Sequence, residues 1–160
     1  MKPIKVLFVC MGNICRSPTA HGVFQQLVQE ANLPFDIVVE SAGTIDYHSG
    51  ESPDDRACDT ARKKGIDLSE LRARKVQIND YLFQDYILAM DYANLKNLTS
   101  DCSSEHLSKI ELLLNYHPDE ALKEVPDPYY GGNKGFENVY DMINVACRRL
   151  LIHIKATHAL

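Results

Sequence analysis

The sequence has 160 residues, which suits one compact domain spanning 1–160 and is short for two. Apolar residues make up 45% and charged residues 24%, so a disordered or fibrous chain is excluded. The 17 basic and 22 acidic side chains leave a net charge of −5, which argues against binding to nucleic acid or a membrane surface. A phosphate site remains possible, because backbone N–H groups and one arginine suffice to build it.

Neither secretion nor membrane insertion is indicated by any segment. The apolar run 6–10 is too short for a signal peptide, and nothing approaches the ~20 apolar residues of a spanning helix. The cysteines are odd in number, so we expect reduced thiols and a cytoplasmic protein. They are Cys10, Cys15, Cys58, Cys102 and Cys147.

Short apolar segments predict four β-strands. The first, 5–10, carries the apolar run 6–10, as strands buried on both faces of a parallel sheet do. The next three are expected over 35–41, 86–90 and about 110–114.

Helical patterns lie between these strands. After the first strand, Ser17 is predicted as an N-cap and Pro18 as the first helical residue. One apolar stripe follows at helical spacing, formed by Ala20, Val23, Phe24, Leu27, Val28 and Ala31. Further helices are expected from Pro53 to a stop at Gly65, over 79–84 and 91–99, and from about Val139 to 153.

Alternating strands and helices predict a single-domain α/β fold with a four-stranded, mostly parallel sheet flanked by helices on both faces. Such sheets bind ligands beyond the carboxyl ends of their strands, near helix N-termini. The loop 10–17 lies there, between the first strand and the first helix.

This loop reads Cys-Met-Gly-Asn-Ile-Cys-Arg-Ser and has the parts of a phosphate-binding loop. A loop that curls onto a helix N-terminus points several N–H groups at one centre, and Gly12 and Asn13 tolerate the positive φ that this usually needs. Arg16 offers a planar fork for two phosphate oxygens and favours a thiolate at Cys10. The hydroxyl of Ser17 either caps the helix or donates to the Cys10 sulfur.

Each residue alone has a simpler interpretation: Cys10 as an inert buried thiol and Arg16 as a surface charge. Together with a preceding strand, Gly-Asn within the loop and Ser-Pro opening a helix, they favour a phosphate loop. A metal site formed by Cys10, Cys15 and His21 is not expected, because no second pair of ligands accompanies them.

A cysteine that displaces a phenolate benefits from an acid that protonates the leaving oxygen. Asp127 is the best candidate, in an acid loop over 125–132 where two flanking prolines restrict the backbone. A simple turn aspartate is the alternative. Tyr129 and Tyr130 either wall a pocket or pack in the core, and Tyr47 is a candidate for the opposite rim.

The sequence resembles the low-molecular-weight protein tyrosine phosphatases over nearly its whole length. The motif Cys-x-Gly-Asn-Ile-Cys-Arg-Ser-Pro and the later Asp-Pro-Tyr-Tyr-Gly occur in the family's order. The segments 40–43, 54–57 and 85–91 also look like family segments.

The resemblance implies that Cys10 attacks phosphorus to form a phosphocysteine, while Arg16 and the loop amides hold the equatorial oxygens and Asp127 acts as acid and then base. It implies that Asn13 stabilises the loop with help from Ser41, and that Ser17 stabilises the thiolate. The substrate-binding residues it implies are Met11, Gly12, Asn13, Ile14, Cys15, Ser17, Tyr47 and Tyr129. The implied partners are phosphotyrosine-containing proteins, with no metal or cofactor.

The resemblance also implies a reversible Cys10–Cys15 disulfide that protects the nucleophile from irreversible oxidation. Tyr129 and Tyr130 stand at positions where some relatives are phosphorylated. One departure concerns a His that many relatives carry after a Gly-Ile-Asp-like turn, because the segment 65–72 contains none. Unless another residue replaces it, the expected effect is a less rigid loop and lower turnover. Nothing in the sequence indicates the oligomeric state.

Three other functions are the alternatives. A thioredoxin-coupled arsenate reductase needs two further cysteines close together, which this sequence lacks. A protein arginine phosphatase typically has Thr at the position of Ile14. A phosphotyrosine-binding module derived from an inactive phosphatase would be expected to have lost Cys10, Arg16 or Asp127.

Overall fold

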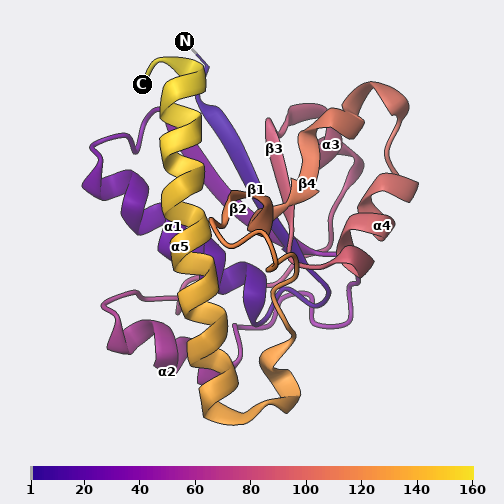
Figure 1. Ribbon diagram of the computed structural model, residues 1–160. Coiled ribbons are helices and arrows are strands. Elements are labelled where there is room, and N and C mark those ends of the chain that lie inside the picture. Colours follow the sequence, from indigo (N-terminus) through magenta and orange to yellow (C-terminus); the bar gives the residue numbers. More distant parts are fainter. Residues whose placement is uncertain (1) are drawn as a thin grey trace.

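The computed structural model describes residues 2–160 as an α/β fold with one four-stranded sheet (Figure 1). The strands are β1 (Ile4–Cys10), β2 (Ile37–Gly43), β3 (Tyr86–Ala89) and β4 (Ile110–Leu112), in the order β2-β1-β3-β4. All three neighbouring pairs are parallel. The predicted fold class is therefore confirmed.

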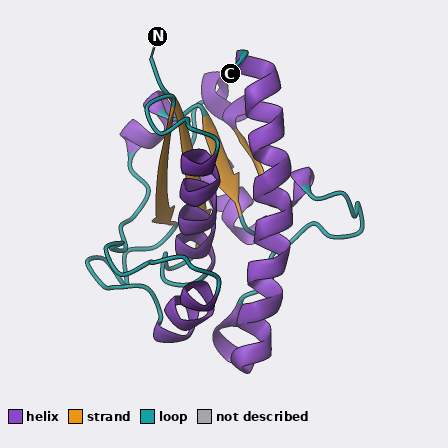
Figure 2. Cartoon of the chain, turned by 90° about the vertical axis from the view of Figure 1, so that its left-hand side faces the viewer, coloured by secondary structure: helices purple, strands orange, loops and turns teal. Residues whose placement is uncertain are grey.

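Helices cover both faces of this sheet. On one side lie α1 (Arg16–Glu30) and the long α5 (Gly132–His158), with α2 (Asp55–Lys63) beside the lower end of α5 in Figure 1. On the other side lie α3 (Ile78–Phe83) and α4 (Tyr92–Ser100) (Figures 1 and 2). Three 3₁₀ segments complete the described elements: Ser104–Lys109, Leu113–Tyr116 and Pro128–Tyr130.

The central strand β1 supplies both halves of the core. Val6 and Phe8 pack with α1 and α5, whereas Leu7 and Val9 pack in a second cluster beneath α3 and α4. Successive side chains of a strand point to opposite faces, so a continuous apolar run is what a sheet covered on both sides requires. The Phe8 ring meets Phe24 of α1 edge-on, with ring centroids 5.6 Å apart.

The element boundaries differ from expectation in a few places. β2 begins two residues later than predicted and extends to Gly43, while Phe35 is exposed in the preceding turn. α1 begins at Arg16 with Cys15 as its N-cap, so the prediction that Ser17 caps this helix was wrong. The last helix is longer than its apolar stripe suggested, at 27 residues.

The two ends of the chain lie together at the edge of the sheet opposite the carboxyl ends of the strands (Figure 1). At the carboxyl edge, β1 leads into the loop 10–17, and the segment before α5 passes nearby. Among residues 2–160, no helix is both long and apolar enough to cross a membrane.

Candidate active site

The carbonyl groups of the loop between β1 and α1 accept hydrogen bonds from residues outside the loop. The N–H of Thr44 donates to the Cys10 carbonyl at 2.9 Å, and the N–H of Asp54 donates to the Ile14 carbonyl at 2.8 Å. The Met11 carbonyl likewise accepts from the N–H of Ile45 at 3.1 Å. These bonds turn the carbonyl oxygens away from the centre of the loop.

The amide groups of the loop are left without protein acceptors. Within residues 2–160, only the Asn13 N–H among positions 11–15 donates, and its acceptor is the Cys10 sulfur at 3.3 Å. Unpaired N–H groups at a helix N-terminus form a ready site for an anion. The amides free to bind one belong to Met11, Gly12, Ile14 and Cys15.

Cys10 lies at the end of β1 and is only 3% exposed, and its sulfur contacts the Ser17 hydroxyl and the Asn13 N–H. The Ser17 hydroxyl is 3.0 Å from it. Asn13 in turn donates its side-chain amide to Ser17 at 2.7 Å. Between the two tasks considered for Ser17, contact with the sulfur is the one observed, since its side chain makes no helix-capping bond.

Asn13 and two glycines make the curl of the loop possible. Asn13 has φ of +58°, a left-handed conformation that asparagine tolerates better than most residues. Gly12 does not have positive φ, contrary to expectation; a Cβ there would instead lie 2.9 Å from the His48 ring. At Gly43, a Cβ would lie 2.6 Å from the Met11 carbonyl oxygen, so the loop passes directly over this glycine.

Arg16 is buried, with only 4% of its surface exposed. Hydrogen bonds from one nitrogen of its guanidinium group hold the side chain in place. Nη1 donates to Asp91 at 2.6 Å and to the Val125 carbonyl at 3.0 Å. Burial opposes the charge, but the neighbouring Cys10 and Asp91 more than offset it, so the pKa of Arg16 is raised. The guanidinium therefore stays positively charged and its other nitrogens remain available to an anion.

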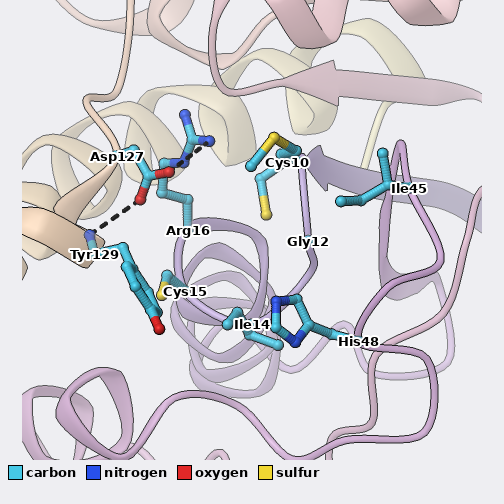
Figure 3. Close-up of a pocket in the computed structure, with 10 residues that line it drawn as sticks. Cys10, Gly12, Ile14, Cys15, Arg16, Ile45, His48, Asp127 and Tyr129 are labelled. Carbon is cyan, nitrogen blue, oxygen red and sulfur yellow. Dashed lines mark hydrogen bonds and ion pairs between the residues drawn. The ribbon is translucent and has the colours of Figure 1, made fainter.

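Asp127 lies across the cavity from the loop. One carboxylate oxygen accepts from the Tyr129 N–H at 3.0 Å, and the other lies 4.0 Å from Nη2 of Arg16 (Figure 3). The side chain is 38% exposed, so it can reach a substrate that enters from solvent. Cys10, Arg16 and Asp127 thus face one space, although they come from three parts of the chain.

The cavity walls are mostly apolar. Ile14 and Ile45 line it on the loop side, with His48 beside them and Tyr129 opposite (Figure 3). The full lining is Cys10, Met11, Gly12, Ile14, Cys15, Arg16, Ile45, His48, Asp127 and Tyr129. Such walls suit a flat aromatic group above a phosphate.

Comparison with known proteins is consistent with this geometry. The sequence model of a family described as "Low molecular weight phosphotyrosine protein phosphatase" matches residues 5–160. The chain belongs to this family. A Bacillus subtilis relative, the low molecular weight protein-tyrosine-phosphatase YfkJ, is 41% identical over 152 residues, covering 95% of this chain and 96% of the relative.

Solved structures of the family superpose closely on this fold. The YfkJ crystal structure has a TM-score of 0.93, with 98% of each chain covered and 40% identity. A protein tyrosine phosphatase from Entamoeba histolytica has a TM-score of 0.93 at 37% identity, covering 97% of this chain and 99% of that one. A Drosophila arginine phosphatase is also similar, with a TM-score of 0.88, 35% identity, and 95% and 98% covered.

One implied site residue occupies an unexpected place in this family member. Tyr47 is 80% exposed and does not line the cavity, because the turn over 46–49 directs Ile45 and His48 inward instead. The Tyr47 ring meets His48 edge-on at 4.8 Å, so Tyr47 lies at the outer rim. The Tyr130 side chain lies outside the described part of the structure.

The support of the loop also differs from expectation. Ser41 does not bond to Asn13; its hydroxyl pairs with Nδ1 of His21 at 3.0 Å. Asn13 is held instead by the backbone N–H of Arg74 at 3.1 Å and by Ser17. Burial and the nearby charge of Arg74 lower the pKa of His21 to about 4, so its ring is neutral at neutral pH.

Several functional residues escaped the sequence analysis. Asp91 was seen only as part of a family-like segment, yet it orients Arg16. His48 and Ile45 follow β2 in a polar stretch whose inward-facing side chains cannot be read from a pattern. A buried arginine needs a carboxylate partner, and this requirement is the one signal that could have pointed to Asp91.

Proposed function

We propose that this chain hydrolyses phosphotyrosine and other aryl phosphate monoesters through a phosphocysteine intermediate. The observation that carries the proposal is the convergence of the Cys10 sulfur, the Arg16 guanidinium and the Asp127 carboxylate on one cavity. The phosphoryl group would bind the free amides of the loop 10–17, within reach of the Cys10 sulfur at the base of the cavity.

The reaction then follows from the positions of these groups. The Cys10 thiolate attacks phosphorus, and Asp127 gives a proton to the leaving phenol oxygen. Arg16 and the loop amides stabilise the equatorial oxygens throughout. In the second step, Asp127 takes a proton from water as the water attacks the phosphocysteine, which releases inorganic phosphate and restores the thiolate.

The depth and the walls of the cavity favour tyrosine over serine. Cys10 and Arg16 are both nearly buried, so a phosphate on a short side chain would bring the substrate backbone against the rim. Ile14 presents an apolar surface to the substrate, which suits a phenyl ring better than a guanidinium. Only Cys15 joins Cys10 in the lining, so no relay of cysteines leads outward, as an arsenate reductase would need.

A matched peptide set tests the substrate class. We expect phosphate release from a phosphotyrosine peptide to exceed release from phosphoserine and phosphoarginine versions by at least about a hundredfold in kcat/KM, measured with reductant and chelator. Asp127→Ala should lower the phosphotyrosine rate about 10²-fold or more, as loss of a general acid does. Faster release from phosphoarginine would overturn the tyrosine preference but leave the loop chemistry standing.

We further propose that Cys15 protects the nucleophile during oxidation. Peroxide would oxidise the Cys10 thiolate to a sulfenic acid with release of hydroxide, and Cys15 would then form the disulfide with loss of water. Burial, with help from Asp54, raises the pKa of the Cys15 thiol, so Cys15 is not expected to be oxidised first. An added dithiol would reduce the disulfide and restore both thiols.

Recovery after peroxide tests this role. Wild-type enzyme treated with a small excess of peroxide should regain most of its activity in a dithiol, whereas Cys15→Ser should remain largely inactive because its Cys10 proceeds to the sulfinic acid. Cys58→Ser, a half-buried cysteine on α2, serves as the control and should recover like wild type. Equal recovery of all three proteins would contradict the proposal.

The natural partners would be proteins that carry phosphotyrosine in an exposed segment able to enter the cavity. A cytoplasmic location is part of this proposal, because the chemistry needs Cys10 reduced. It is supported by the odd number of cysteines in the sequence, five, which favours reduced thiols.

A further inference from the structure

The acid loop is held differently on the two sides of Asp127. On the upstream side, Val125 is fixed to the sheet, since its N–H donates to the Met90 carbonyl at 2.8 Å and its carbonyl accepts from Arg16. On the downstream side the chain makes a 3₁₀ turn over Pro128–Tyr130 before α5 begins. Asp127 itself accepts from the Tyr129 N–H, so the position of Tyr129 sets the position of the carboxylate.

Arg56 of α2 contacts this downstream part of the acid loop. Its Nη1 donates to the Tyr129 carbonyl at 3.0 Å, and its guanidinium carbon lies 5.1 Å from the centre of the Tyr129 ring. The same guanidinium lies 4.7 Å from the ring of Phe136, a buried residue in the first part of α5. Arg56 therefore contacts both the backbone and the ring of the residue that bonds to Asp127.

Arg56 is itself held by Asp54, which also touches the phosphate loop. The Asp54 carboxylate accepts from Nε and Nη2 of Arg56 at 3.1 and 3.0 Å, a two-point pairing. The Asp54 backbone N–H donates to the Ile14 carbonyl within the loop. Burial opposes the Asp54 charge, but the hydrogen bonds from Arg56 outweigh it and lower the pKa of this carboxyl, so the pair is ionised.

The geometry points to Arg56 as a positioning residue for the general acid. A continuous path of contacts runs from the loop that holds the phosphate, through Asp54 and Arg56, to Tyr129 and the carboxylate of Asp127. This path sets the distance across the cavity between the Asp127 carboxylate and the loop 10–17. The inference rests on the proposed role of Asp127 as acid.

An arginine is needed for this task because one planar group makes three kinds of contact at once. Two nitrogens pair with the carboxylate, a third bonds a carbonyl, and the faces meet the aromatic rings. The ammonium of a lysine keeps the charge but cannot make this set of contacts. Arg56→Lys therefore separates geometry from charge.

The test is the dependence of kcat/KM on the leaving group, because this constant reports the steps up to departure of the phenol. Tyrosine, with a phenol pKa of about 10, needs protonation on departure, whereas 2,4-dinitrophenol leaves without it. We expect Arg56→Ala and Arg56→Lys to lower kcat/KM at least about tenfold for a phosphotyrosine peptide and less than about twofold for 2,4-dinitrophenyl phosphate. Arg62→Ala is the matched control, since Arg62 lies on the same helix, pairs with Asp59 and, among the side chains that the structure describes, has no hydrogen bond to the acid loop.

Arg56→Ala combined with Asp127→Ala completes a double-mutant cycle. If Arg56 acts through Asp127, Arg56→Ala should cost less than about twofold there for either substrate. Equal slowing of both substrates, an undiminished loss in the Asp127→Ala background, or no loss at all would overturn the inference. Thermal melting checks folding, and Arg56→Lys decides the question if Arg56→Ala does not fold.

The design separates this inference from the proposed function. If Asp127→Ala slows the phosphotyrosine peptide but not 2,4-dinitrophenyl phosphate, Asp127 is the acid, and a failure of the Arg56 variants then contradicts this inference alone. If Asp127→Ala slows both substrates equally, the role of Asp127 and the inference built on it fail together.

Discussion

Replacing Cys10 by Ser should lower kcat/KM for a phosphotyrosine peptide by about 10⁴-fold or more, the scale of loss when a hydrolase is deprived of its nucleophile. An alcohol ionises far less readily than a thiol. Within residues 2–160, the groups hydrogen-bonded to the Cys10 sulfur are the Ser17 hydroxyl and the Asn13 amide, and neither can act as a base to activate serine. Phosphate release in a coupled assay measures this loss.

The binding site should survive the Cys10→Ser substitution. The loop amides and Arg16 are unchanged, so the variant should still bind a phosphotyrosine peptide in a calorimetric titration and not its unphosphorylated form. Cys58→Ser is the control for loss of a thiol and should retain full activity, because Cys58 does not line the cavity. Residual turnover within about tenfold of wild type would exclude Cys10 as the nucleophile.

The intermediate gives a second readout. Asp127→Ala with 2,4-dinitrophenyl phosphate should form the phosphocysteine rapidly and hydrolyse it slowly, because the leaving group needs no acid while the attacking water lacks its base. Quenching in alkali, in which the P–S bond is stable, followed by mass spectrometry should then find one phosphoryl group on the peptide that contains Cys10. Its appearance on any other residue would contradict the mechanism.

Replacing Arg16 by Lys should lower kcat/KM at least about a hundredfold, although the charge is kept. Nη1 is already committed to Asp91 and the Val125 carbonyl, which leaves the other nitrogens of the planar group for the phosphoryl oxygens. A single ammonium cannot keep both anchors and also bind two oxygens. The loss corresponds to about 2.7 kcal/mol of transition-state stabilisation.

Arg62→Lys is the control for this substitution, because Arg62 is an exposed arginine with one surface partner. The loss in Arg16→Lys should appear with phosphotyrosine and with 2,4-dinitrophenyl phosphate alike, since both transition states carry the same phosphoryl group. This pattern distinguishes Arg16 from Asp127 and Arg56, whose effects should depend on the leaving group. Near-wild-type activity of Arg16→Lys would mean that the loop amides carry the phosphate alone.

The sequence by itself determined the class of fold and the position of the proposed nucleophile. The apolar run of β1, the helical stripe of α1 and the residues between them are adjacent in the chain, so their local pattern already specifies a strand, a loop and a helix N-terminus. Cys10 and Arg16 follow from that pattern, because both belong to the same short loop. The assignment of Asp127 as the acid rests on the family resemblance more than on its neighbouring residues, and it stays a prediction.

Only the tertiary structure decided which groups surround these residues. The Arg16–Asp91 and Arg74–Asn13 bonds join residues 75 and 61 positions apart, and Arg16 reaches Val125 across 109 positions. A parallel sheet brings the carboxyl ends of its strands to one edge, but hydrophobic patterns do not say which side chains of the following loops turn inward. The places of His48, Tyr47 and Arg56 depend on contacts of the same kind, such as the Ile45–Met11 bond and the bond of Arg56 to Tyr129 across 73 positions, so they could be read only from the folded chain.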